Sequence, residues 1–233
     1  MLEVGALNGW YGPAHILSDV DLDVGTGDVV ALLGRNGAGK STTFKAIVGL
    51  LGKRTGHIVF DGRDVSTAST HAIVRAGLGY VPEDRRIFTE LSVMENLEVG
   101  RQPPRADAPT WTPDRLFALF PNLAEMRNRL GGRMSGGEQQ MLTIARTLMG
   151  NPRLVLLDEP SEGLAPKIVE EMAHAILAMK REGLSIVISE QNLHFARLIC
   201  DRAVILESGR VRFSGTIAEL EARPEIRDAY LAL

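Results

Sequence analysis

Hydrophobic and polar residues alternate along several short segments in the first third of the chain. The segment from Ile16 to Val24 has the period of two that is typical of a half-buried strand. A weaker alternation over 2–7 predicts an edge strand. Short apolar runs at 28–33, 57–60 and 78–81 predict three further strands, separated by turn residues or helical patterns.

Helical spacing of the apolar residues dominates from about residue 89 to residue 150. Ser92 is a candidate N-cap for the first helix of this segment. Three prolines predict a surface loop over 102–112, and another helix is expected over 115–130 with an interruption at Pro121. The segment therefore predicts a mostly helical insertion.

Strands and helices alternate again after residue 150. The tail, 217–233, is expected to be helical in two pieces around Pro224. The other predicted elements are strands at 153–157 and 185–188, helices at 168–181 and 193–199, and a hairpin over 203–213. Strands that alternate with helices predict an α/β fold with a mostly parallel sheet covered by helices.

A phosphate-binding motif follows the predicted strand 28–33 and matches the pattern G-x-x-x-x-G-K-[ST]. Its glycines let the backbone turn sharply and aim N–H groups at phosphate oxygens, and the helix that begins at Gly39 or Lys40 directs its positive end at the same anion. We expect Lys40 to reach the β- and γ-phosphates of ATP and the Ser41 hydroxyl to bind Mg²⁺. A strand before the motif and a helix after it favour this over a glycine-rich turn without a ligand. The nine residues of the motif are Gly34, Arg35, Asn36, Gly37, Ala38, Gly39, Lys40, Ser41 and Thr42.

Two carboxylates end the predicted strand 153–157. Asp158 occupies the place where a P-loop nucleotidase holds Mg²⁺ with a carboxylate. Glu159 comes next, and a carboxylate beside the metal can orient and deprotonate an attacking water. A charged turn after a strand is common, so the catalytic interpretation depends on the P-loop upstream.

A third motif lies between these two and comprises Ser135, Gly136, Gly137, Glu138 and Gln139. Ser135 is a candidate N-cap, and the glycines leave the first helical N–H groups exposed. The motif is either a capped helix start or a second anion site. Because the chain would then have two phosphate sites and one metal site, the simplest explanation is that the second site covers the nucleotide of another copy.

Composition and charge narrow the range of functions. The 233 residues are 45% hydrophobic and 24% charged, and the net charge of −3 offers no basic face for nucleic acid. No apolar run approaches the ~18 residues of a membrane span, and the N-terminus does not read as a signal peptide. The single cysteine, Cys200, excludes an intrachain disulfide and fits a reducing cytoplasm. The five histidines show no metal-ligand spacing.

The three motifs together resemble those of the ATP-binding subunits of ABC transporters, and the resemblance covers essentially the whole chain. It implies a single ATP-binding domain over 1–233, with a P-loop NTPase core at 1–88 and 151–233, an N-terminal antiparallel β region and a helical subdomain at about 89–150. It also implies a head-to-tail dimer in which ATP and Mg²⁺ lie between one P-loop and the other subunit's 135–139 motif. By the same resemblance, Tyr11 would stack on adenine, although an aromatic at this turn could also pack in the core.

Three positions depart from the usual family pattern. Glutamate stands at Glu83 where glutamine is usual, glutamine at Gln191 where histidine is usual, and alanine at Ala165 where aspartate is usual. These variants resemble the smaller ATPase subunit of branched-chain amino acid importers. The resemblance places Glu83 beside the metal and Gln191 beside the γ-phosphate.

The resemblance also implies the partners and the location. They are a second ATPase subunit, identical or paralogous, two polytopic permease subunits, and indirectly a periplasmic solute-binding protein, with the chain peripheral on the cytoplasmic face of the inner membrane. Transport of urea, short amides or another small polar solute is the nearest alternative. An ABC ATPase of DNA repair or translation is disfavoured by the acidic charge, and a P-loop small-molecule kinase would leave 135–139 unexplained.

The segment from Glu83 to Phe88 is a candidate link to the membrane subunit. It follows a predicted strand that Pro82 ends, and we expect it to expose Ile87 and Phe88 beside two arginines. The alternative is a surface loop whose apolar residues fold inward, and the sequence favours neither.

Overall fold

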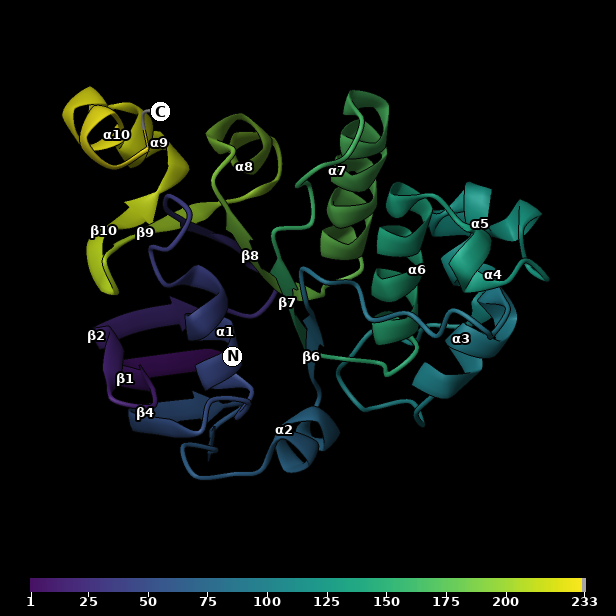
Figure 1. The fold of residues 1–233 in the computed structure, drawn as a ribbon, viewed down its shortest axis with the longest axis horizontal. Coiled ribbons are helices and arrows are strands. Elements are labelled where there is room, and N and C mark those ends of the chain that lie inside the picture. The colour runs from purple at the N-terminus through teal and green to yellow at the C-terminus, as the bar shows by residue number, and fades with distance from the viewer. Residues whose placement is uncertain (232–233) are drawn as a thin grey trace.

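Two β-sheets and a helical region make up the part of the chain that the computed structural model describes, residues 1–231 (Figure 1). The ten strands are β1 (Leu2–Tyr11), β2 (Ala14–Val24), β3 (Val29–Leu33), β4 (Lys53–Phe60), β5 (Arg63–Asp64), β6 (Leu78–Val81), β7 (Leu154–Asp158), β8 (Ser185–Glu190), β9 (Arg202–Glu207) and β10 (Arg210–Thr216). One sheet has four strands in the order β2-β1-β4-β5, and the other has six in the order β10-β9-β3-β8-β7-β6.

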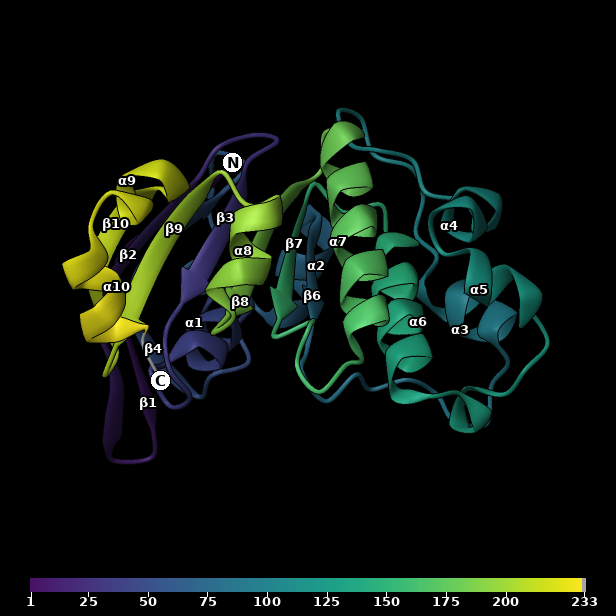
Figure 2. The same cartoon turned by 90° about the horizontal axis from the view of Figure 1, so that it is seen from above.

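Ten α-helices and a short 3₁₀ helix connect these strands. They are α1 (Lys40–Ile47), α2 (Thr70–Ala76), α3 (Val93–Gly100), α4 (Pro113–Leu119), α5 (Pro121–Glu125), the 3₁₀ helix Gly131–Arg133, α6 (Gly136–Leu148), α7 (Pro166–Arg181), α8 (Leu193–Ile199), α9 (Ile217–Glu221) and α10 (Pro224–Tyr230). In both views, α3, α4, α5 and α6 gather at the end of the molecule away from β1, β2 and β4 (Figure 2).

The six-stranded sheet lies between two apolar cores. Strands β3, β6, β7, β8 and β9 run parallel, and β10 pairs antiparallel with β9. Because side chains alternate across a strand, Val30 and Leu32 pack with α1 and the four-stranded sheet, while Val29, Ala31 and Leu33 pack on the other face with α6, α7 and α8. Both faces are covered, so β3 is apolar throughout.

The strand order brings distant parts of the chain to one edge. Leu33 of β3 pairs with Glu190 of β8, and Asp158 of β7 pairs with Ser189. The carboxyl ends of parallel strands therefore meet directly beside the P-loop, as ligand sites in open α/β sheets do.

Reciprocal capping bonds fix the starts of α3 and α6. The Ser92 side chain accepts from Glu95 N while the Glu95 carboxylate accepts from Ser92 N, and Ser135 and Glu138 form the same reciprocal pair at α6. Both serine N-caps agree with the sequence prediction. Replacing such a cap by alanine costs a helix about 1 kcal/mol.

Most predicted elements are present, and three expectations were wrong. Strand β1 is not an edge strand, because it lies between β2 and β4. The helix expected over 115–130 ends at Glu125, and 126–130 runs irregularly toward the 3₁₀ helix. Of the two apolar residues expected to be exposed after β6, Phe88 is exposed, whereas Ile87 is half-buried and packs against the core. The tail forms α9 and α10 around Pro224 as predicted, except that its last two residues lie outside the described part.

Candidate functional site

The P-loop wraps tightly between β3 and α1. Gly34 has φ +156, and a Cβ there would lie 2.4 Å from the carbonyl oxygen of Leu206. Gly39, the N-cap of α1, has φ +111, in the left-handed region that favours glycine. Arg35, Asn36 and Gly37 form the exposed outer side of the loop. The N–H groups of Gly34 and Ala38 donate to the carbonyls of Glu190 and Arg35, so an anion would be bound by the other loop N–H groups and the N-terminus of α1.

Lys40 joins the P-loop to the carboxylate end of β7. Its Nζ donates to the carbonyls of Gly34 at 2.8 Å and Arg35 at 3.1 Å. It also forms an ion pair with Glu159 Oε1 at 3.1 Å, and the two side chains are only 3% and 7% exposed. A buried cation next to a buried carboxylate is stable only while each has its partner.

Asp158 is held by three hydroxyl groups from three different elements. Ser41 Oγ donates to Oδ1 at 2.9 Å, Ser189 Oγ donates to Oδ1 at 2.6 Å, and the Tyr80 hydroxyl donates to Oδ2 at 3.1 Å. Burial, together with the negative charge of Asp158, raises the pKa of Tyr80, so the phenol stays a donor. The carboxylate is therefore fixed in orientation at the strand end.

Glu159 lies in a constrained turn beside a second carboxylate. Its φ is +46, and its N–H donates to Ser189 O at 3.1 Å and to Ser189 Oγ at 2.9 Å. Burial opposes its ionisation, but hydrogen bonds from Glu162 and Lys40 outweigh burial and lower the pKa of Glu159. The hydrogen bond to Glu159 is also the main reason that the pKa of Glu162 rises to about 7.

Glu190 and Gln191 differ in burial although they adjoin each other at the end of β8. Burial raises the pKa of Glu190, whose Oε1 accepts from Ser161 N at 3.3 Å. Gln191 is exposed at the same sheet edge as Asp158. Its amide is thus free to reach a ligand placed outside this edge.

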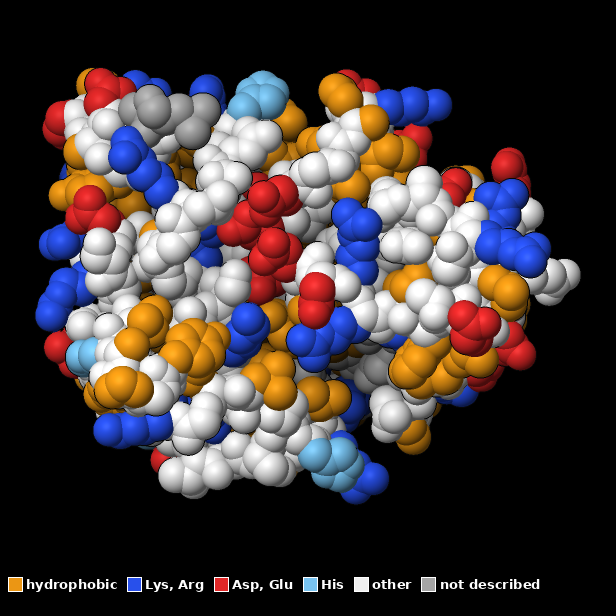
Figure 3. Space-filling model, viewed as in Figure 1, with side chains coloured by type: hydrophobic (Ala, Val, Ile, Leu, Met, Phe, Trp, Pro, Cys, Tyr) orange, Lys and Arg blue, Asp and Glu red, His pale blue; other side chains and the backbone are white. Residues whose placement is uncertain are grey.

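Charged side chains of both signs surround this edge. Figure 3 shows acidic side chains gathered near the centre of this face, with Lys and Arg side chains beside them. Glu83 is exposed in the turn after β6, and its charge is felt at Glu162. Tyr11 lies at the end of the β1–β2 hairpin and is 48% exposed, so it is not a core residue.

The 135–139 motif forms the start of α6. Ser135 is exposed, and Gly136 and Gly137 are half-buried. Gln139 Nε2 donates back to the carbonyls of Gly131 and Met134 at 3.2 and 3.3 Å. The hydrogen bonds that the Ser135 and Gln139 side chains make thus stay within their own turn. Ser135 is therefore at the surface, while the two glycines approach the side chains of Arg85 and Ile168.

The segment after β6 is fixed to the same helix. Arg85 and Arg86 both have positive φ, +61 and +51. Thr143 Oγ1 donates to the carbonyl of Arg85 at 2.9 Å, and Arg146 Nη2 donates to the carbonyl of Arg86 at 2.7 Å. Two side chains of α6 thus attach this turn to the helix.

Comparison with known proteins identifies the family and the fold. The family model described as ABC transporter matches residues 17–162, more than half of the chain. The chain belongs to the ABC transporter ATP-binding family. A high-affinity branched-chain amino acid transport ATP-binding protein, BraG of Pseudomonas aeruginosa, is 41% identical over 231 residues that cover 99% of both chains.

Two further relatives mark the breadth of this ABC family. The lipopolysaccharide export system ATP-binding protein LptB of Haemophilus influenzae is 36% identical and covers 95% of this chain and 92% of its own. A solved ATP-binding subunit of an ABC transporter superposes with a TM-score of 0.81 at 32% identity, covering 99% of this chain and 96% of that one. The chain is thus an ABC ATPase that binds ATP and couples its hydrolysis to transport. No helix within residues 1–231 is long and apolar enough to cross a membrane.

Three residues of the site were not predicted from the sequence. Tyr80 and Ser189 orient Asp158, and Glu162 contacts Glu159. Ser189 stands at the end of a predicted strand next to the residues already singled out, so its position was a usable signal. Tyr80 carried no such signal, because its contact depends on β6 lying beside β7.

Proposed function

We propose that the chain is the ATP-hydrolysing subunit that powers import of branched-chain amino acids, acting on the cytoplasmic face of the inner membrane. The proposed ATP hydrolysis rests on two contacts: Lys40 pairs with Glu159, and Ser41 donates a hydrogen bond to Asp158. The solute rests on similarity alone, since the BraG relative is the more similar of the two transport systems. Lipopolysaccharide export is the alternative that the LptB relative favours, and import of urea, short amides or another small polar solute is a third.

Phosphate binding would rearrange the buried ion pair. In the structure Lys40 is shared between loop carbonyls and Glu159. When the γ-phosphate of ATP enters the loop, Lys40 would exchange the Glu159 carboxylate for phosphate oxygens. Glu159 would then no longer contact Lys40, one of the groups that lower its pKa here, and its carboxylate would be available to accept a proton from an attacking water. Nucleotide binding would thus release the catalytic base.

The donor set around Asp158 fits Mg²⁺. The Ser41 hydroxyl and the Asp158 carboxylate supply hard oxygen ligands, and Glu83 adds an exposed carboxylate nearby. Within residues 1–231 no cluster of three or more His, Cys, Asp or Glu could hold a metal alone. Magnesium is commonly held by one or two protein groups together with phosphates, and it neutralises charge on the β- and γ-phosphates. Tyr80 and Ser189 would keep Asp158 oriented toward it.

The remaining site residues take positions around this centre. Tyr11 would stack on the adenine from the end of the β1–β2 hairpin. Gln191 would contact the γ-phosphate or the attacking water through its amide, which donates and accepts hydrogen bonds but does not titrate. The 135–139 motif of a partner subunit would close the site from the other side. We also propose that the helical subdomain at about 89–150 carries this motif to the partner.

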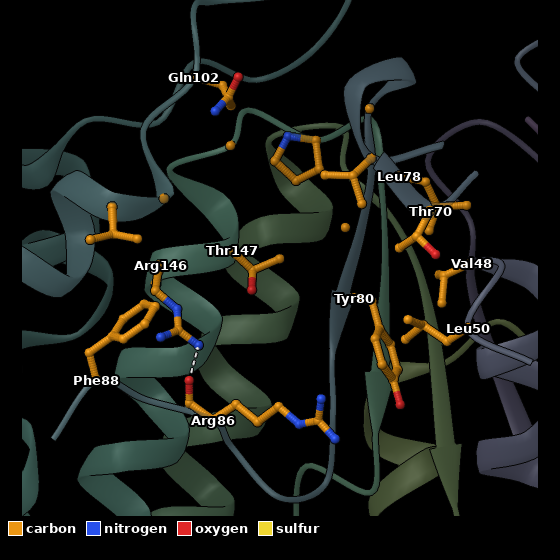
Figure 4. A pocket seen from close by; sticks show the side chains of 17 residues that line it. Val48, Leu50, Thr70, Leu78, Tyr80, Arg86, Phe88, Gln102, Arg146 and Thr147 are labelled. Carbon is orange, nitrogen blue, oxygen red and sulfur yellow. Dashed lines mark hydrogen bonds between the residues drawn. The ribbon is translucent and has the colours of Figure 1, made fainter. Parts of the chain in front are cut away.

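An apolar groove lies between α2, β6 and the helical subdomain. It encloses about 440 Å³, and four of the exposed large hydrophobic side chains line it: Leu50, Val74, Phe88 and Val99. Figure 4 shows Phe88 and Arg146 on one side, Leu50 and Tyr80 on the other, and the Arg86 side chain extending between them toward Tyr80. We propose that this groove receives the permease. Its occupant would then act directly on the turn that carries Glu83.

The decisive experiment is reconstitution with the membrane subunits. The chain is co-purified with the permeases encoded beside its gene, placed in liposomes with the solute-binding protein, and assayed for ATPase and uptake. Stimulation by leucine, isoleucine or valine with matching uptake supports the proposal. Stimulation by urea or an amide favours the small-solute alternative. Association only with lipopolysaccharide-exporting components would contradict import.

A further inference from the structure

A second hollow lies at the amino ends of β6 and β7, whereas the P-loop lies at the carboxyl ends of the strands. It encloses about 180 Å³ and is lined by Phe60, Asp61, Arg63, Arg75, Ala76, Arg105 and Arg153. The strands β6 and β7 begin here, where Leu78 pairs with Leu154, whereas Asp158 lies at the other end of β7. Nothing in the ATPase site uses these residues.

Two of its four arginines are built into the wall. Arg105 Nε donates to the carbonyl of Asn151 at 3.1 Å, and its Nη1 donates to the carbonyl of Arg75 at 2.6 Å, at the end of α2. Arg153 Nη2 donates to the carbonyl of Ala106 at 2.9 Å, and its Nη1 pairs with Asp61. Burial, and to a lesser extent the charge of Arg153, lowers the pKa of Arg105. Two like charges are therefore held close together.

The positive charge of the hollow is not balanced by the protein. Asp61 is the only carboxylate that lines it, and this side chain already pairs with Arg153. Arg153 Nε is buried and finds no acceptor among residues 1–231. The guanidinium groups of Arg63 and Arg75 make no hydrogen bond or ion pair with any described side chain or carbonyl. The chain as a whole carries a net charge of −3, so this local excess does not follow from composition.

We propose that this hollow binds a phosphate group, either inorganic phosphate or the phosphodiester of an anionic lipid headgroup. Guanidinium forks match phosphate oxygens in geometry and bind them with two parallel hydrogen bonds. Arg105 and Arg153 form the fixed wall, and Arg63 and Arg75 close over the anion from solvent. The exposed guanidinium groups of Arg63 and Arg75 supply the N–H donors that would bind the phosphate oxygens.

The position of the hollow makes both sources of phosphate reasonable to test. It adjoins the apolar groove, because Val74, Gly77 and Gln102 line the groove while the neighbouring Arg75, Ala76 and Arg105 line the hollow. A face that receives a permease is close to lipid headgroups. Phosphate released by ATP hydrolysis is also present wherever this ATPase works.

The test uses the full chain with Lys40→Ala, which weakens phosphate binding at the P-loop. Inorganic phosphate is titrated calorimetrically into this protein and into the same protein with Arg63→Gln and Arg75→Gln. The matched control carries Arg181→Gln and Arg210→Gln, two exposed arginines elsewhere with the same loss of charge. We expect at least a tenfold loss of affinity in the hollow variant and none in the control, because each charge-assisted contact contributes strongly.

A second arm separates the two sources. The same proteins are floated with phosphatidylcholine vesicles that contain or lack phosphatidylglycerol. Selective loss of phosphate binding in the hollow variant identifies free phosphate as a ligand. Absent phosphate binding, with selective loss of binding to phosphatidylglycerol vesicles, identifies the lipid headgroup. No binding in either assay, or equal loss in the control variant, overturns the proposal, and none of these outcomes depends on ATP hydrolysis or on the transported solute.

Discussion

Among the single residues of the site, Lys40 can pair with either of two anions, the Glu159 carboxylate or a bound phosphate. In the structure it pairs with Glu159, and both side chains are almost fully buried. A phosphate in the loop competes for the same ammonium group. Breaking a buried ion pair leaves a charge without a partner. Exchange of Glu159 for phosphate at Lys40 is therefore favourable only if phosphate oxygens take over the contacts that the carboxylate makes with the ammonium group. In the proposed mechanism, the pair holds the Glu159 carboxylate until nucleotide binds.

Replacing the proposed base tests this arrangement. Glu159→Gln should lower ATP turnover by roughly 10²–10⁴-fold, the usual contribution of a general base. ATP affinity should stay the same or rise, because Lys40 no longer has to leave a carboxylate. Steady-state phosphate release and equilibrium nucleotide binding measure the two quantities. Glu170→Gln, which removes an exposed carboxylate of α7, is the control and should change neither. Wild-type turnover in Glu159→Gln would remove Glu159 from the site.

Glu162 should make stability depend on pH in a defined window. Its pKa is raised from 4.5 to about 7 in the folded chain, chiefly by its hydrogen bond to Glu159. Between these values the folded state binds the proton more tightly than the unfolded chain, so this group's contribution to stability falls as pH rises from 4.5 to 7. Above that window both carboxylates are charged and repel each other.

Glu162→Gln removes this titration and keeps a hydrogen-bond donor. Glu162 is exposed, so solvent screens the repulsion and limits its cost to about 0.2–1 kcal/mol. We expect a Tm increase of roughly 1–3 °C at about pH 8 and no change at about pH 5. Thermal unfolding followed by circular dichroism at both pH values measures this. Equal shifts at both would show that the carboxylates do not interact.

At the scale of elements, one turn joins both sheets to the P-loop. Gly209, between β9 and β10, donates its N–H to the carbonyl of Ala38 at 2.8 Å and accepts from Ser18 N at 2.9 Å. A Cβ there would lie 1.8 Å from the carbonyl oxygen of Ile16 in β2. The close backbone approach therefore requires glycine.

Gly209→Ala should lower the free energy of unfolding by about 2–4 kcal/mol, because backbone atoms must separate. Gly27→Ala is the matched control. Gly27 also has positive φ, +78 against +72 for Gly209, but no atom lies within 4 Å of its added Cβ. Only the conformational strain of about 1–2 kcal/mol should appear there. Urea unfolding of the wild type and the two variants separates the cost of the steric contact from that of backbone strain. Equal losses of unfolding free energy in both variants would mean that the contact with β2 is unimportant.

The elements differ in how well the sequence predicts them. Helix α8 has the predicted boundaries, because Asn192 caps it and its apolar residues keep helical spacing. Local alternation cannot reveal which strands are neighbours, so β1 was expected at an edge although it pairs on both sides. Local sequence motifs predicted four site residues: Lys40, Ser41, Asp158 and Glu159. The contact of the Tyr80 hydroxyl with Asp158 was not predicted, because it depends on which strands are neighbours. Contacts that arise from sheet order need the fold itself.

The apolar groove permits a test of coupling. Phe88 is 47% exposed and its ring lies 5.1 Å from the guanidinium carbon of Arg146. Phe88→Ala should change folding stability little, yet weaken association with the permease by tens-fold, the effect of losing an aromatic anchor at an interface. Leu198→Ala, which removes a side chain 55% exposed outside the groove, is the control. Pull-down of detergent-solubilised permease with each variant measures the association, and ATPase of the isolated chain should be unchanged in both. Equal permease binding by both variants would exclude the groove as the docking site.

At the scale of the whole molecule, the two proposed phosphate-binding elements belong to different parts of the chain. The P-loop lies between β3 and α1 in the core, whereas the 135–139 motif starts α6 in the helical region (Figures 1 and 2). The hydrogen bonds of the Ser135 and Gln139 side chains stay within residues 131–139. One chain would therefore supply one half of each of two sites. A head-to-tail pair satisfies both halves with the same surface on each copy.

This arrangement makes mixing two inactive variants informative. Lys40→Ala removes the P-loop cation, and Gly137→Trp places a bulky side chain at the start of α6, where even a Cβ would lie 2.9 Å from Ile168 Cγ2. Each variant alone should be inactive. In a mixed head-to-tail dimer one site combines both defects and the other combines the intact P-loop of one chain with the intact motif of the other. Random pairing should then restore about a quarter of wild-type ATPase, since half of the dimers are mixed and each has one working site.

Dimerisation of this chain with itself is measured first, by size-exclusion chromatography of Glu159→Gln with ATP and Mg²⁺. A shift to the dimer makes the mixing experiment decisive. If the chain dimerises but the mixture stays inactive, the 135–139 motif acts on its own chain's nucleotide and the head-to-tail model is wrong. If it remains monomeric, the Gly137→Trp variant is mixed with the paralogous ATPase subunit instead. In the paralogous pair, Gly137→Trp should leave ATP affinity of the isolated chain unchanged while stopping hydrolysis at the partner's P-loop, because the bulky side chain blocks close approach to phosphate.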